Sequence, residues 1–138
     1  MPAKQFLDTN ILLYAYDQHA GEKREKAAAI VHDALLSPAD TAISVQVLQE
    51  FFVNFVRAGQ SPETAAQVID DFSRWTIIPN TFSLFKDGLH LQARWQLSLW
   101  DAMILAAAHR SGATSLITED LNHGQAYATT IAQNPFKL

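Results

Sequence analysis

Short apolar segments alternate with longer helix-forming stretches along this 138-residue chain, and this alternation restricts the fold more than any other feature. Strands are predicted at residues 4–7, 41–43, 76–78, 115–118 and, near the end, 129–132. Parallel strands need long crossover connections, which are usually helices. We therefore expect an α/β fold, a three-layer α/β/α sandwich around a mainly parallel central sheet of four or five strands.

Helix start and stop signals divide the remaining chain. A short helix is predicted to begin near Ile11, and longer helices are predicted at 22–36, 44–58, 62–75, 81–96 and 98–111. Ser44 and Ser98 are residue types that cap helix N-termini, and Gly59 and Gly112 suit helix C-termini. Because no linker, repeat or low-complexity segment interrupts the pattern, residues 1–138 are expected to form one domain.

Charge and composition narrow the function classes. The chain has 14 acidic and 10 basic residues, a net charge of −4 and no cysteine, so disulfide and thiol chemistry are excluded. There is no apparent signal peptide and no run of roughly 20 apolar residues, so we expect a cytoplasmic protein without membrane association. The acidic balance is unusual for a nucleic-acid-binding protein. The densest basic stretch contains Lys23, Arg24 and Lys26, which could form an ordinary solvated helix face or contact RNA.

Two acidic residues directly follow predicted strands. Asp8 comes after the first strand in FLDTNILLY, where it could simply cap the short helix. Asp120 follows the fourth strand in LITEDLNHGQ, where a turn-forming aspartate is the simplest explanation and Glu119 is an alternative functional acid.

Two more acidic residues lie on predicted helices. Glu50 shares a polar stripe with Gln46, Asn54 and Arg57, and this stripe could face solvent or a polar pocket. Asp101 lies three residues after Ser98, which is capping-box spacing, although Asp stands where Glu or Gln is usual. The helix dipole would also hold the Asp101 carboxylate ionised in this first turn, which suits a metal ligand. If Asp101 served only as part of the helix cap, Trp100 would simply belong to the core.

Asp8, Asp101 and Asp120 all fall at predicted junctions that could share one edge of the sheet. Carboxylates packed together raise one another's pKa unless a cation neutralises them. Oxygen-only clusters prefer hard cations such as Mg²⁺ or Mn²⁺. Such ions can polarise a phosphodiester and activate a water molecule for attack. The acids therefore suggest a metal site for phosphodiester hydrolysis.

Four segments in order, FLDTNILLYA, SVQVLQEFFVN, SLWDAMILAAA and LITEDLNHGQ, resemble the motifs of PIN-domain proteins, most closely the VapC-type toxins of toxin–antitoxin systems. This resemblance implies a PIN-like domain with Mg²⁺- or Mn²⁺-dependent endoribonuclease activity. By the same resemblance, Asp8, Glu50, Asp101 and Asp120 would be the catalytic metal ligands.

The resemblance also implies supporting residues and partners. By this resemblance Thr9 or Asn10 would support Asp8, and the basic stretch at 23–26 becomes a candidate to contact RNA. Further candidates to surround the ligands are Asn54, Thr118 and His123, of which His123 is predicted in a loop beside Asp120. Relatives of this kind are commonly homodimers inhibited by a cognate antitoxin protein. Many relatives carry a further acid shortly after the fourth position, whereas residues 121–123 supply none here.

Two other functions remain open from the sequence. A catalytically silent PIN-like module would bind nucleic acid or a protein without cutting, in keeping with the acidic charge and the missing further acid. A DNA-directed nuclease would keep the same chemistry, but the short chain shows no added DNA-binding element.

Overall fold

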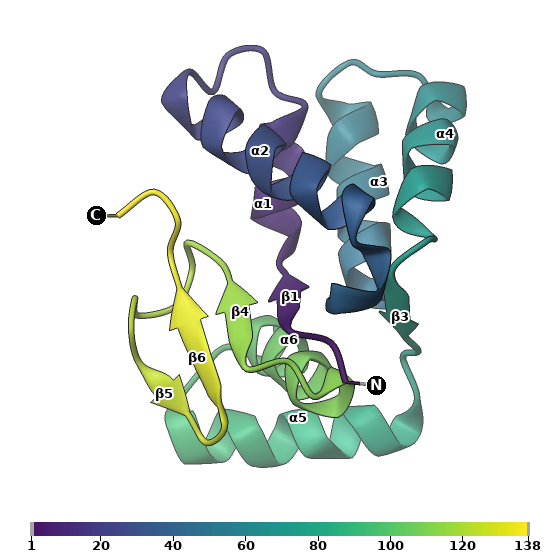
Figure 1. Ribbon diagram of the computed structural model, residues 1–138. Helices are drawn as coiled ribbons and strands as arrows, with labels where there is room; N and C mark the ends of the chain where they lie inside the picture. The colour runs from purple at the N-terminus through teal and green to yellow at the C-terminus, as the bar shows by residue number, and fades with distance from the viewer. Residues whose placement is uncertain (1, 138) are drawn as a thin grey trace.

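The computed structural model describes residues 2–137 and contains a mainly parallel sheet (Figure 1). Its strand order is β3-β2-β1-β4-β6-β5, with β1 at Gln5–Leu7, β2 at Thr41–Ser44, β3 at Thr76–Ile78, β4 at Ser115–Ile117, β5 at Ala126–Tyr127 and β6 at Thr130–Gln133. β1 pairs in parallel with both β2 and β4. The predicted α/β fold with a mainly parallel central sheet is therefore confirmed.

The sheet differs from the expectation of four or five strands by one short strand. β5 has two residues and pairs antiparallel with β6, joining Ala126 to Ile131 and Tyr127 to Thr130. Ala128 in the connecting turn has a positive φ of 59°. Two residues are too few to show an alternating pattern, so sequence periodicity could not reveal this edge strand.

Six α-helices and one short 3₁₀-helix at Pro38–Asp40 accompany the sheet in residues 2–137. The α-helices are α1 at Thr9–Ala15, α2 at Glu22–Leu36, α3 at Val45–Arg57, α4 at Pro62–Phe72, α5 at Phe82–Trp95 and α6 at Leu99–Ser111. None of these helices, within the described part of the chain, has the length and apolarity that crossing a membrane requires.

The predicted caps of α3 and α6 are present. The Ser44 and Ser98 hydroxyls accept hydrogen bonds from the backbone N–H groups three residues ahead, at 3.3 and 3.1 Å. Helix α4 ends three residues before the predicted end at Trp75. The Trp75 ring stacks on Phe72 at 5.0 Å, and its indole N–H donates to the Ala34 carbonyl at 3.0 Å. Trp75 is thus packed against Phe72 and α2 in the turn between α4 and β3.

Helices flank the sheet (Figure 1). α6 contacts β1, β2 and β3, and α5 packs along α6 in the lower part of the view. Helices α1 to α4 gather in the upper part, where α1 packs on α2 and α3, and α3 packs on α4. Because β1 and β4 run in parallel with Leu7 opposite Ile117, the residues that follow them emerge at the same edge.

Candidate functional site

All four predicted acids line one pocket at the carboxyl ends of β1 and β4. The pocket has a volume of about 240 Å³. Its walls come from the residue after β1, from α1, α3 and α6, and from the segment after β4. The lining residues are Asp8, Thr9, Asn10, Leu13, Gln46, Glu50, Asn54, Trp100, Asp101, Ile104 and Asp120. We call it the acidic pocket.

Asp8 is the most buried acid of the acidic pocket, with 5% of its surface exposed. One carboxylate oxygen accepts from the Thr9 backbone N–H at 2.7 Å, which caps α1 at Thr9, two residues before the predicted start. The other oxygen accepts from the Thr118 hydroxyl at 2.7 Å. Asp8 therefore caps the helix and also faces the pocket, so the two interpretations of this residue are compatible.

The charge of Asp8 is unfavourable in this position. Burial raises its pKa from 3.8 to about 7, and the hydrogen bonds from Thr118 and Thr9 offset only part of the rise. The nearby carboxylates of Asp120 and Glu50 raise it further. A positive charge in the pocket would favour the ionised form of Asp8.

Asn10 and Thr118 join Asp8 to Asp120. The Asn10 side-chain amide donates to Asp120 Oδ2 at 3.0 Å and lies 3.4 Å from Asp8 Oδ2. The Thr118 hydroxyl accepts from the Asp120 backbone N–H at 3.0 Å. The Asn10 Oδ1 atom is buried and has no hydrogen-bond partner in residues 2–137. A buried acceptor of this kind has a position open for a donor or a cation.

Glu50 points toward the acidic pocket. Its carboxylate accepts from the Thr9 hydroxyl at 2.7 Å, which connects α3 to α1. The Asn54 side chain lies in the same pocket but donates to the backbone carbonyl of Glu50, at 2.8 Å. The polar stripe of α3 was predicted to face either solvent or a polar pocket. Its members Gln46, Glu50 and Asn54 line the acidic pocket, whereas Arg57 does not.

Asp101 lies in the first turn of α6 and is half-buried. Burial raises its pKa, and the Asp120 carboxylate adds to the rise, whereas a hydrogen bond with Ser98 lowers it. Glu50 contributes a smaller increase. The Asp120 and Glu50 carboxylates therefore raise the pKa of both Asp8 and Asp101.

The donor chemistry of the acidic pocket fits a hard divalent cation. It offers four carboxylates and the free amide oxygen of Asn10, all oxygen ligands. In the described residues, however, no three Asp, Glu or His side chains converge closely enough to hold one ion as they stand. Hydroxyl and amide donors from Thr9, Asn10 and Thr118 hold the carboxylates instead.

Glu119, the alternative to Asp120, lies outside the acidic pocket. Its carboxylate accepts from the Tyr14 hydroxyl and pairs with Lys23 Nζ at 2.9 Å. Burial opposes ionisation, but these two donors lower the pKa of Glu119 below its usual value. Glu119 thus forms an ion pair on the α1–α2 side, and Asp120 is the acid in the pocket.

The predicted RNA-contacting bases do not line the acidic pocket. Besides its pairing with Glu119, Lys23 Nζ lies 4.9 Å from the Tyr14 ring centre and 5.4 Å from that of Phe136. Arg24 and Lys26 lie on the same helix, α2, with Arg24 exposed and Lys26 half-buried. His123 is also outside the pocket, where its Nδ1 accepts from the Asn134 backbone N–H at 2.9 Å.

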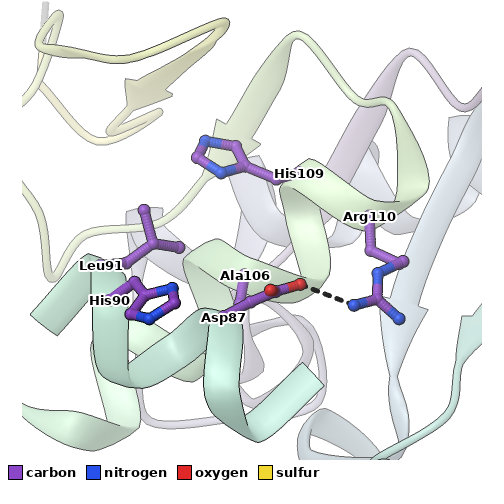
Figure 2. Close-up of a pocket in the computed structure, with 6 residues that line it drawn as sticks. All are labelled: Asp87, His90, Leu91, Ala106, His109 and Arg110. Carbon is purple, nitrogen blue, oxygen red and sulfur yellow. Dashed lines mark hydrogen bonds and ion pairs between the residues drawn. The ribbon is translucent and has the colours of Figure 1, made fainter. Parts of the chain in front are cut away.

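A second cavity lies between α5 and α6, with a volume of about 370 Å³ (Figure 2). Arg110 and Asp87 form an ion pair across it at 2.6 Å. His109 on its rim bonds through Nε2 to the Tyr127 carbonyl at 2.8 Å, which ties α6 to β5. This cavity contains none of the four predicted acids, and its acid is already neutralised by an arginine. The acidic pocket is therefore the stronger candidate for chemistry.

A family model described as PIN domain matches residues 6–128, which include all four acids of the pocket. The chain belongs to the PIN domain family. No curated protein matches it in sequence.

Several solved structures share its fold. A toxin–antitoxin complex from Klebsiella pneumoniae matches with a TM-score of 0.73 and 21% identity over 98% of this chain and 100% of that one. VapC20 of Mycobacterium tuberculosis, described as a sarcin–ricin loop cleaving toxin, matches with a TM-score of 0.66 and 19% identity over 82% and 87%. A DNA-bound VapBC from Salmonella typhimurium matches with a TM-score of 0.67 and 19% identity over 96% and 98%.

Four residues that line this PIN domain pocket were not predicted as site residues: Leu13, Gln46, Trp100 and Ile104. Gln46 is only 8% exposed, and its amide donates to the Trp100 carbonyl at 3.3 Å. The prediction that Trp100 belongs to the core is wrong, because 65% of this residue is exposed. The helical stripe that contains Gln46 and Glu50 was the one sequence signal for Gln46. No local pattern distinguished Trp100 from the apolar residues that follow it.

Proposed function

We propose that this PIN domain is a divalent-metal-dependent endoribonuclease and the toxin of a toxin–antitoxin pair. The observation that carries the proposal is the convergence of Asp8, Glu50, Asp101 and Asp120, from separate parts of the chain, on one pocket. The membership of the PIN domain family and the fold shared with VapC20, a toxin described as cleaving the sarcin–ricin loop, support it.

Each group in the acidic pocket has a role in this proposal. Asp8, Asp101, Asp120 and Glu50 would hold Mg²⁺ or Mn²⁺, which when bound polarises a phosphodiester and activates water. Thr118 would keep Asp8 oriented through its hydroxyl, and Thr9 would do the same for Glu50. Asn10 would hold Asp120 at its present distance from Asp8.

The partners in this proposal are RNA, a cognate antitoxin and a second copy of the chain. The structural relatives include toxin–antitoxin complexes from Klebsiella pneumoniae and Salmonella typhimurium, which support the antitoxin. The homodimer and the RNA substrate rest on the family resemblance.

A second candidate function is a silent PIN module that binds a partner without cutting. One observation favours it: in residues 2–137, no three acidic or histidine side chains form a ready ion-binding group. An inert module would need neither an ion nor the clustered acids, and the cost of burying Asp8 would then have no functional purpose.

The experiment is cleavage of a labelled RNA pool with Mn²⁺, with Mg²⁺ and with EDTA. Asp101→Asn keeps the side-chain shape but removes a charge from the pocket, so we expect metal-dependent cleavage by the parent and at least a hundredfold loss in the variant. Asp70→Asn, the same change on the exposed face of α4, is the matched control and should cut like the parent.

Equal cleavage by the parent and Asp101→Asn would reject the site. Tight RNA binding without cleavage of any RNA would favour the silent module. Calorimetric titration with Mn²⁺ helps to separate the two functions, because the nuclease must bind the ion at this site and the inert module need not.

A further inference from the structure

Trp100 is a large aromatic residue exposed on a helix that is otherwise mostly buried. It is 65% exposed, whereas all residues from Ala102 to Ala108 are buried. Within residues 2–137, its ring forms no aromatic pair and no cation–π contact. Single exposed apolar residues are common on protein surfaces, so exposure alone shows nothing. The position of Trp100 provides the second observation.

Trp100 lies beside the proposed reaction site. It lines the acidic pocket and directly precedes Asp101 in the chain. Its carbonyl accepts from the Gln46 amide, and Gln46 is one helical turn before Glu50 on α3. The Ser98 cap fixes the first turn of α6. The backbone that carries the indole ring is therefore held at both α3 and the helix start.

The negative charge of the acidic pocket favours an uncharged mode of contact with RNA. The chain has a net charge of −4, and four carboxylates line the pocket, so RNA phosphates are repelled where they must approach. Lys23 is already paired with Glu119 and is no strong attractant. Stacking of a base on an aromatic ring needs no positive charge and tolerates any base.

We propose that Trp100 is a stacking platform that holds an unpaired nucleobase of the RNA beside the bond to be cut. This inference rests on the proposed ribonuclease function and adds a residue that positions its substrate. The faces of bases in a duplex are already stacked on their neighbours, so contact with Trp100 requires a base that is free to turn outward.

The test combines variants of Trp100 with changes in the RNA. The rates of Trp100→Ala, Trp100→Phe and the parent are measured with Mn²⁺ on a short RNA that the parent cuts. The same RNA is then made with an abasic nucleotide at each position flanking the cut. Phe82→Ala is the control, since Phe82 is 75% exposed near the start of α5 and does not line the pocket.

We expect Trp100→Ala to lower kcat/KM on intact RNA by roughly 5- to 150-fold, the range that corresponds to loss of one base stack. The loss should appear mainly in KM, and Trp100→Phe should recover most of it. An abasic nucleotide at one position should lower kcat/KM of the parent by a similar factor. The same abasic nucleotide should not change kcat/KM of Trp100→Ala, because this variant has already lost the ring on which the base stacks. Phe82→Ala should match the parent.

Several outcomes would overturn the inference. An equal loss for Trp100→Ala on intact and abasic RNA would indicate damage to the pocket instead of a lost stack. Parent-like rates for Trp100→Ala, with Asp101→Asn inactive, would reject the inference alone and keep the ribonuclease function. A changed oligomeric state in light scattering with unchanged RNA kinetics would assign Trp100 to a protein interface. No metal-dependent cleavage by the parent would reject both proposals.

Discussion

Asp8 should destabilise the metal-free protein at neutral and alkaline pH. Because the folded-state pKa is about 7 and the ordinary value is 3.8, the folded chain keeps a proton that the unfolded chain releases between those two pH values. The contribution of Asp8 to stability is therefore expected to be most favourable below about pH 4, to fall as the pH rises to 7, and to change little above it. At ~1.36 kcal/mol per pH unit, the shift corresponds to about 4 kcal/mol at pH 8.

Asp8→Asn removes this charge and keeps most of the local contacts. The Asn side-chain oxygen can still accept from the Thr9 N–H that caps α1, and its amide can donate to the Thr118 hydroxyl. The new amide group at position 8 would also face the side-chain N–H group of Asn10, which places two donors opposite each other. Rotation of the Asn10 amide by a half-turn would instead present its Oδ1 atom, which has no partner in residues 2–137. A charged acceptor receives stronger hydrogen bonds than a neutral one, and their loss offsets part of this benefit. We therefore expect the free energy of unfolding to increase by about 1–3 kcal/mol at pH 8.

The assay is urea denaturation of the parent and Asp8→Asn in EDTA, at pH 4 and pH 8. Comparison of the two proteins at each pH cancels the titration of all other groups, so the gain should be present at pH 8 and nearly absent at pH 4. Asp70→Asn on the exposed face of α4 should show no such difference. A gain of equal size at both pH values, or a loss of stability at pH 8, would refute the argument that burial of the Asp8 charge is costly.

Two further predictions concern the same pocket. Addition of Mn²⁺ at 100 times its dissociation constant should stabilise the parent at pH 7.5 by about 2.7 kcal/mol and should stabilise Asp101→Asn much less, as measured by thermal denaturation. EDTA should reverse the effect, and equal stabilisation of both proteins would place the ion elsewhere. Thr118→Val removes the hydroxyl that donates to Asp8 and accepts from the Asp120 N–H, so it should lower the free energy of unfolding by about 1–3 kcal/mol, and by more at pH 8 than at pH 4. Thr129→Val, in an exposed turn, is its control, and a loss of stability independent of pH would indicate a packing effect alone.

The order and type of the main elements could be predicted because their signals are local. Ser44 and Ser98 satisfy backbone N–H groups only three residues away, so their role is visible in the sequence. Asp8 and Asp120 could be assigned to one sheet edge because they follow strands, and parallel pairing brings such ends together. β5 was missed because its two residues form a strand only when β6 lies beside them.

The sequence by itself determined which residue types stand at the strand ends and helix starts, since short-range hydrogen bonds and apolar periodicity define these positions. Only the tertiary structure decided which way the side chains face. Glu50 turns inward because Thr9, 41 residues away, donates to it, and Lys23 pairs with Glu119 across 96 residues. Trp100 stays exposed although its neighbours are buried. These outcomes depend on contacts between distant segments, which no local pattern encodes, because the same stripe or apolar residue is compatible with either face until its neighbours are in place.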